Sequence, residues 1–91
     1  ELHEYEGYIN EMVEPDLSQN EFDALVSWVF NLGPSNLRAS TLLKKLNAKD
    51  WTDVPNQIKR WNKVAGVPNE GLMKRRNAEA LLFEGKEWVT V

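Results

Sequence analysis

"SQNEFDALVSWVFNLGP", residues 18–34, decides the fold, because it carries the signals for both ends of an unusually apolar helix. Its first four residues match a capping box, in which the Ser18 hydroxyl accepts a hydrogen bond from the Glu21 backbone and the Glu21 carboxylate reaches back. Gly33 and Pro34 are typical of a helix end. Apolar side chains lie nearly all round the helix between these signals, as in a helix that other elements surround. The stretch therefore predicts a central, buried helix.

The segments on either side of this helix also have helical patterns. Before it, apolar residues recur at steps of three and four until Pro15, as on one face of an amphipathic helix: Leu2, Tyr5, Ile9 and Met12. After it, we expect short helices that begin at Ser40 or Thr41 and near Asp50 and Asp53, a loop over residues 65–71, and a last helix from Asn69 to Phe83. No alternating strand pattern of useful length is present. The prediction is an all-α fold, a compact bundle of five or six helices around the central apolar helix.

Length and composition limit the classes of function. The 91 residues suffice for one domain, and 42% hydrophobic with 27% charged residues is ordinary for a globular chain. A net charge of −3 argues against a sequence-independent nucleic-acid binder. The absence of cysteine excludes disulfides and thiolate metal sites, and the single histidine, His3, cannot build a histidine metal site or a catalytic triad by itself. No apolar run approaches the roughly 20 residues that span a membrane.

The last predicted helix carries charges on its apolar side. At 100° per residue, Arg76 and Glu79 fall in the middle of the face that also holds Leu72, Met73, Ala80 and Phe83. Residues three apart are neighbours on a helix, so the favoured interpretation is a partly buried structural pair, Arg76–Glu79. The alternative makes Arg76 the ligand of an anion. Arg75 lies on the flank of this face and is freer to reach a groove.

Several residues can be interpreted either as structural or as ligand-binding residues. Asn31, between Phe30 and Leu32, is either an exposed residue near a helix end or a residue that faces a groove where a polar ligand binds. Four tryptophans invite a sugar-stacking role, but Trp28 and Trp61 have apolar helical neighbours and are assigned to the core. Trp51 and Trp88 lie near element ends. The run Lys74–Arg76 is too short and too interleaved with core positions for a nucleic-acid patch, although a small DNA-binding helical domain remains a third hypothesis.

Four of these stretches, in this order, resemble the larger, C-terminal lobe of the phage-type lysozymes, the endolysins that cleave peptidoglycan. They are "FDALVSWVFNLG" (Phe22–Gly33), "STLLKKLN" (Ser40–Asn47), "RW" (Arg60–Trp61) and "GLMKRRNAEALLF" (Gly71–Phe83). The resemblance covers essentially the whole chain. It implies that residues 1–14 are the tail of an inter-lobe helix and residues 15–91 the C-terminal helical lobe. The chain begins inside a helical pattern, so we expect the N-terminal catalytic lobe to be missing from it.

The resemblance implies a muramidase that hydrolyses the β-1,4 bond of peptidoglycan for host cell lysis, without metal or cofactor. It also implies a parent endolysin that is made in the host cytoplasm and acts in the periplasm or cell wall. In that family the small lobe supplies a catalytic Glu, with an Asp and a Thr after it, and the large lobe forms one wall of the cleft. Carried over by position, Phe30 and Asn31 line that wall and Arg75 faces the catalytic Glu.

This sequence contains a superficial match to the catalytic Glu-Gly stretch of the family. In "HEYEGY", residues 3–8, Glu6 would be the acid, but the helix, Pro15 and the capping box follow it instead of a Gly-rich hairpin. We therefore expect a solvated helix carboxylate at Glu6, no catalytic residue in this chain and no activity of the chain alone. The alternative function is a non-catalytic helical module that binds peptidoglycan or a protein.

Overall fold

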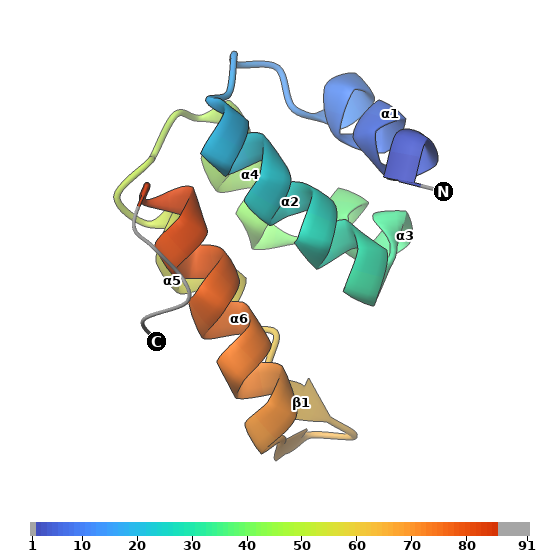
Figure 1. Ribbon diagram of the computed structural model, residues 1–91, viewed down its shortest axis with the longest axis vertical. Coiled ribbons are helices and arrows are strands. Elements are labelled where there is room, and N and C mark those ends of the chain that lie inside the picture. Colours follow the sequence, from blue (N-terminus) through green and yellow to red (C-terminus); the bar gives the residue numbers. More distant parts are fainter. Residues whose placement is uncertain (1, 86–91) are drawn as a thin grey trace.

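The central element of the molecule is α2 (Gln19–Leu32), which lies between α1 (Leu2–Met12) and α6 (Glu70–Phe83) (Figure 1). The structure is a computed structural model and describes residues 2–85, with the side chains of Leu2, His3 and Val64 left out. The expectations for His3 and Trp88 therefore lie outside the described residues. Three short helices cover the other side of α2: α3 (Pro34–Arg38), α4 (Thr41–Asn47) and α5 (Val54–Lys59). The predicted all-α fold with six helices is confirmed.

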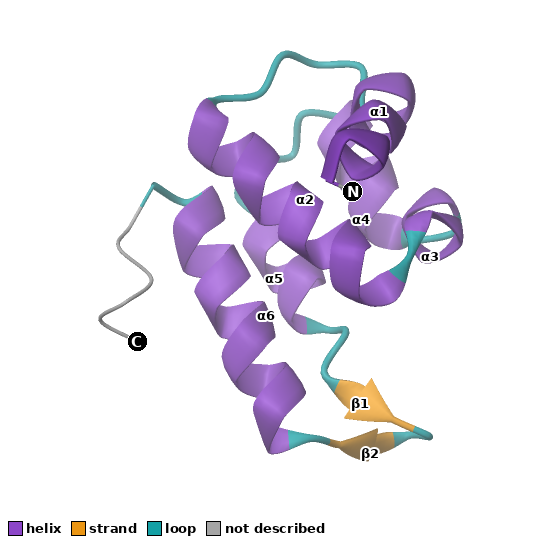
Figure 2. Ribbon diagram, turned by 45° about the vertical axis from the view of Figure 1, so that its right-hand side comes forward, coloured by secondary structure: helices purple, strands orange, loops and turns teal. Residues whose placement is uncertain are grey.

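A small antiparallel ribbon interrupts the helical pattern. It pairs β1 (Lys63–Val64) with β2 (Val67–Pro68), in the register Lys63↔Pro68 and Val64↔Val67 (Figure 2). Ala65 and Gly66 form the turn with φ of 51° and 82°, and a two-residue turn with both φ positive suits the twist of a hairpin. The prediction of a plain loop over residues 65–71 is therefore wrong in part, because strands of two residues are too short to give a periodic signal.

The signals at the two ends of α2 act as the sequence predicts. The Glu21 backbone N–H donates to the Ser18 hydroxyl at 3.2 Å, and the Ser18 backbone N–H donates to the Glu21 carboxylate at 2.8 Å. At the other end Gly33 has a φ of 93°, a conformation that residues with a side chain rarely adopt. Pro34 then opens α3 at once, so Gly33 is the single residue between the two helices.

The core surrounds α2 on most of its circumference. Residues 24–26 and 28–29 are buried, and Ser27 is the one half-buried position among residues 24–29. The remaining core side chains come from the other five helices and from Val13, directly after α1: Ile9, Val13, Leu37, Leu42, Leu46, Val54, Ile58, Ala80 and Phe83. The prediction that α2 is a buried central helix is confirmed.

The end of α1 is fixed by a single side chain from α4. The amide of Asn47 donates through Nδ2 to the carbonyl of Met12 at 3.1 Å and accepts through Oδ1 from the backbone N–H of Glu14 at 2.8 Å. Helix α1 ends at Met12, three residues before the proline that was expected to end it. Asn47 therefore holds two backbone groups that the helix itself leaves free.

Candidate functional site

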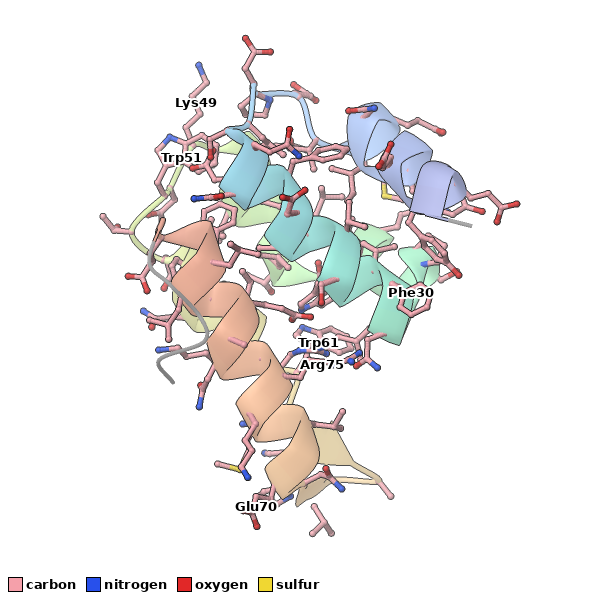
Figure 3. The ribbon with its side chains drawn as sticks, viewed as in Figure 1. Phe30, Lys49, Trp51, Trp61, Glu70 and Arg75 are labelled. Carbon is pink, nitrogen blue, oxygen red and sulfur yellow. The ribbon has the colours of Figure 1, made fainter. Side chains whose placement is uncertain are left out.

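Residues of α1, α2 and α6 line an open hollow of about 360 Å³ in the surface of the protein. We call it the α2–α6 cavity. Glu6 comes from α1, Arg75 from α6 and the rest of the lining from α2: Asp23, Val26, Ser27 and Phe30. Figure 3 shows Phe30 and Arg75 on the same side of the molecule. The cavity thus brings together residues from the two ends of the chain, Glu6 and Arg75.

One face of α2 supplies most of this lining. Its four residues are spaced at i, i+3, i+4 and i+7, which is the spacing of neighbours on one side of a helix. Phe30, at the end of this face, is 57% exposed, and the ring of Tyr5 packs edge to face on it with centroids 5.3 Å apart. The exposed aromatic ring is therefore held in place from α1.

The α2–α6 cavity carries charges of both signs beside an apolar surface. The carboxylates of Glu6 and Asp23 and the guanidinium of Arg75 share it with Val26 and Phe30. Glu6 is half-buried, whereas the sequence analysis expected a solvated carboxylate. Helix α2 packs against α1, and the Glu6 side chain keeps part of its exposure to solvent. A concave site with an aromatic ring and a few charged groups suits a ligand that has both polar groups and an apolar face.

Directly behind the cavity lies a buried ion pair. Nε of Arg76 is 2.7 Å from Oε1 of Glu79, Nη2 donates to Oε2 at 2.8 Å, and the two side chains are 0% and 1% exposed. The hydroxyl of Ser27 donates to the same Oε2 at 2.6 Å. Burial raises the pKa of Glu79, while Ser27 and Arg76 act in the opposite direction. Burial also lowers the pKa of Arg76, which nevertheless stays charged because arginine does not deprotonate in proteins.

Of the site residues predicted from the sequence, two line the α2–α6 cavity and the others do not. Phe30 and Arg75 meet in the α2–α6 cavity, but Asn31 is exposed in the last turn of α2 and does not line it. Arg76 forms the expected structural pair, and its complete burial excludes the alternative in which it binds an external anion. Asp23 and Ser27 were missed, although their spacing from Phe30 on α2 was available as a signal.

The described tryptophans behave largely as core residues. Trp28 is fully buried, as predicted, and Trp61 packs edge to face on it with centroids 5.3 Å apart. Trp61 is half-buried and also lines a second hollow of about 350 Å³ with Arg60 and Gln57. Trp51 is half-buried, and the centroid of its ring lies 6.4 Å from that of Phe83. An aromatic surface for a ligand is thus offered by Phe30 and by one side of Trp61.

Other classes of site find little support within residues 2–85. No described helix has the length and apolarity that a bilayer span requires. No group of three or more His, Cys, Asp or Glu in this part of the chain is arranged to hold a metal ion. The run Lys74–Arg76 does not form a basic patch, because Arg76 is buried and the Lys74 ammonium lies 3.7 Å from the Glu70 carboxylate.

Comparison with known proteins identifies related chains. The family model described as phage lysozyme matches residues 1–79. An endolysin of Acyrthosiphon pisum secondary endosymbiont phage 1 is 44% identical over 80 residues, which cover 84% of this chain and 55% of the relative. An endolysin of Bacillus phage B103 is 39% identical over 83 residues, which cover 91% of this chain and 32% of the relative.

A solved structure shares the fold as well as the sequence pattern. The muramidase domain of SpmX from Asticaccaulis excentricus superimposes with a TM-score of 0.84 and 31% identity, over 90% of this chain and 58% of that domain. The chain therefore spans about a third to somewhat more than half of the length of these relatives.

Proposed function

This chain belongs to the phage lysozyme family, and from that premise we propose that it forms one wall of the peptidoglycan cleft of a muramidase. The reaction would be hydrolysis of the β-1,4 bond between N-acetylmuramic acid and N-acetylglucosamine. The observation that supports the proposal most directly is the α2–α6 cavity, where exposed Phe30 and Arg75 lie beside two carboxylates.

Each residue of this wall has a separate task in binding the glycan. The ring of Phe30 offers a flat apolar surface to the C–H face of a sugar, and Tyr5 keeps that ring in one orientation. The guanidinium of Arg75 can hold a carboxylate, either of the substrate or of a catalytic residue, through a pair of hydrogen bonds. Asn31, one residue beyond Phe30 and exposed, is assigned to the polar groups of a sugar outside the cavity.

The catalytic carboxylate of the proposed enzyme belongs to a second lobe, and the 91-residue chain alone is inactive. A glycosidase acid needs a raised pKa and direct access to the glycosidic oxygen. Burial does raise the pKa of Glu79, but this carboxylate is 1% exposed and is bound to Arg76 and Ser27. Glu79 therefore cannot reach a substrate, and Glu6 is the carboxylate to test if the chain proves active.

The proposed partners and place of action follow from the family. The partner lobe supplies the opposite wall and the acid, and the substrate is the glycan strand of peptidoglycan. Relatives named endolysins from several phages support an enzyme of host lysis that works at the cell wall. Neither nucleic acid nor a metal cofactor has a part in this proposal.

A non-catalytic module is the second candidate. The same cavity would then bind peptidoglycan or a protein without cleaving it. The observation in favour is that the chain covers only 58% of the muramidase domain of SpmX and still forms its own core around α2.

Binding to insoluble peptidoglycan tests the wall directly. We expect Arg75→Ala to weaken retention of this chain about tenfold, the loss of one charged hydrogen-bonding group. Phe30→Ala should also weaken it, and Asn31→Ala by less. Lys74→Ala is the matched control, because it removes the neighbouring cation, which does not line the cavity. Unchanged retention of both Arg75→Ala and Phe30→Ala would show that this cavity is not the glycan site.

An assay of peptidoglycan hydrolysis distinguishes three cases: a wall that needs a second lobe, a binding module, and a chain that is active by itself. We expect no loss of turbidity when the chain alone is added to permeabilised cells, and loss once the proposed second lobe is supplied. Activity of the chain alone would place the acid within these residues, and Glu6→Gln would then abolish it. Retention on peptidoglycan without activity in either mixture would favour the binding module.

A further inference from the structure

Ser27 belongs at once to the α2–α6 cavity and to the buried ion pair behind it. It lines the cavity together with Phe30, and its hydroxyl donates to Oε2 of Glu79 at 2.6 Å. All its neighbours among residues 24–29 are buried, so Ser27 is a half-buried polar position within the core-facing part of α2, beside Val26 in the cavity lining. Neither the family assignment nor the proposed wall gives this serine a role.

The hydrogen bond from Ser27 joins α2 to α6 through a rigid acceptor. Oε2 of Glu79 accepts from both Ser27 and Nη2 of Arg76, and Oε1 lies 2.7 Å from Nε of the same guanidinium. The carboxylate is thus held by two hydrogen bonds to Oε2 and by the close ion contact at Oε1. The carboxylate therefore transmits the position of the Ser27 hydroxyl to the backbone of α6.

Arg75 is the residue that this arrangement places. It lies four residues before Glu79, so these two side chains are neighbours on α6, and it directly precedes Arg76 in the chain. The charge of Arg75 reaches the pair, since it lowers the pKa of both Arg76 and Glu79. A small rotation of α6 about its axis would move the long side chain of Arg75 across the cavity.

We propose that Ser27 is a positioning residue, whose hydrogen bond to Glu79 fixes the rotation of α6 and thereby places the Arg75 guanidinium for glycan binding. The proposal rests on the proposed function of the cavity. Ser27 acts through Glu79 and Arg75 and makes no contact with the glycan.

A double-mutant cycle on binding separates positioning from direct contact. The probe is the disaccharide of N-acetylglucosamine and N-acetylmuramic acid, titrated into the 91-residue chain. We expect Ser27→Ala to weaken binding roughly fivefold when Arg75 is present, and to have no further effect in the Arg75→Ala background. Ser27→Thr, which keeps the hydroxyl, should bind like the original chain. Equal losses in both backgrounds, or no loss from Ser27→Ala, would overturn the proposal.

A core variant controls for simple destabilisation. Val29→Ala truncates a buried residue of α2 that does not line the cavity, so it should lower the melting temperature without changing the affinity of the folded chain. If Val29→Ala weakens binding as much as Ser27→Ala does, the effect is general loosening and the proposal is wrong.

If the disaccharide does not bind, that result counts against the proposed function of the cavity but does not test the role of Ser27. A measurement without ligand tests that role. The side-chain ¹⁵Nε resonance of Arg75, assigned by its loss in Arg75→Lys, reports the surroundings of the guanidinium. We expect it to shift in Ser27→Ala, and to stay in place in Ser27→Thr and Val29→Ala. An unchanged resonance in Ser27→Ala would show that Ser27 does not place Arg75.

Discussion

The molecule contains two groups of ion pairs whose surroundings differ. Arg76 and Glu79 are 0% and 1% exposed and approach to 2.7 Å. Lys45 pairs with Asp50 at 3.3 Å and Asp53 at 3.5 Å, and these side chains are 35%, 39% and 31% exposed. The charged groups of the first pair are shielded from water in the folded chain, whereas those of the second group remain partly hydrated. Only the first group is therefore expected to hold elements of the fold in place.

One carboxylate in each group, Glu79 and Asp53, has a shifted pKa, and the two shifts have opposite directions. Burial raises the pKa of Glu79 despite the adjacent guanidinium. Hydrogen bonds from Gln57, Asn56 and Lys45 lower the pKa of Asp53, which water still reaches. A neighbouring cation does not by itself decide the sign of the shift, because desolvation opposes it and wins where water is excluded.

The largest expected effect is the loss of one partner in the buried pair. Glu79→Ala leaves Arg76 charged and buried without a counter-ion, which should cost about 3–5 kcal/mol of unfolding free energy. Denaturant unfolding measures this loss. Glu70→Ala, at an exposed glutamate of the same helix, is the control and should change stability by no more than about 0.5 kcal/mol. Equal effects of the two substitutions would contradict the contrast drawn between buried and exposed charges.

A smaller effect of the opposite sign is expected when both charges are removed together. The double variant Arg76→Met with Glu79→Leu replaces the pair by apolar side chains of similar length, so no buried charge remains. Its stability should equal that of the original chain or exceed it by about 1–4 kcal/mol. Thermal unfolding beside Glu79→Ala provides the measurement. A double variant as unstable as Glu79→Ala would mean that the ion pair itself, and not its burial without a partner, carries the stability.

The smallest effect belongs to the exposed group and depends on pH. Since folding lowers the pKa of Asp53, its ionised form stabilises the native state above the usual aspartate pKa of about 3.9, and this contribution is lost as the pH falls through the lowered value. Asp53→Asn should therefore be slightly less stable than the original chain at pH 7 and equal to it in strong acid. Melting temperatures from pH 7 to pH 2 test this.

Local patterns made much of the fold predictable. The capping box at Ser18 and the Gly33–Pro34 stop depend on residues a few positions apart, and the structure has both. The Arg76–Glu79 pair was predictable because its members lie one turn apart on a face that is otherwise apolar. Met73 was placed on that face wrongly and is 41% exposed, because the first turns of α6 extend beyond α2 toward the β1–β2 ribbon (Figure 1).

The candidate site was predictable only in part, because three helices build it. Phe30 and Arg75 were expected in a groove from the family resemblance, but the half-buried position of Glu6 depends on how α1 packs against α2. No pattern within α1 reports that packing. The same holds for Ser27 and Glu79, whose hydrogen bond joins residues 52 positions apart.

The amide of Asn47 has a consequence for the dynamics of the site. It tethers the C-terminal end of α1 through Met12 and Glu14, whereas nearer to its start the helix is held by packing such as Tyr5 on Phe30. We therefore expect the amides at the Met12 end of α1 to be protected against hydrogen exchange for as long as this tether holds. Since Glu6 lines the cavity from the same helix, opening of α1 removes part of the lining, and the apparent affinity scales with the fraction of molecules in which α1 is closed.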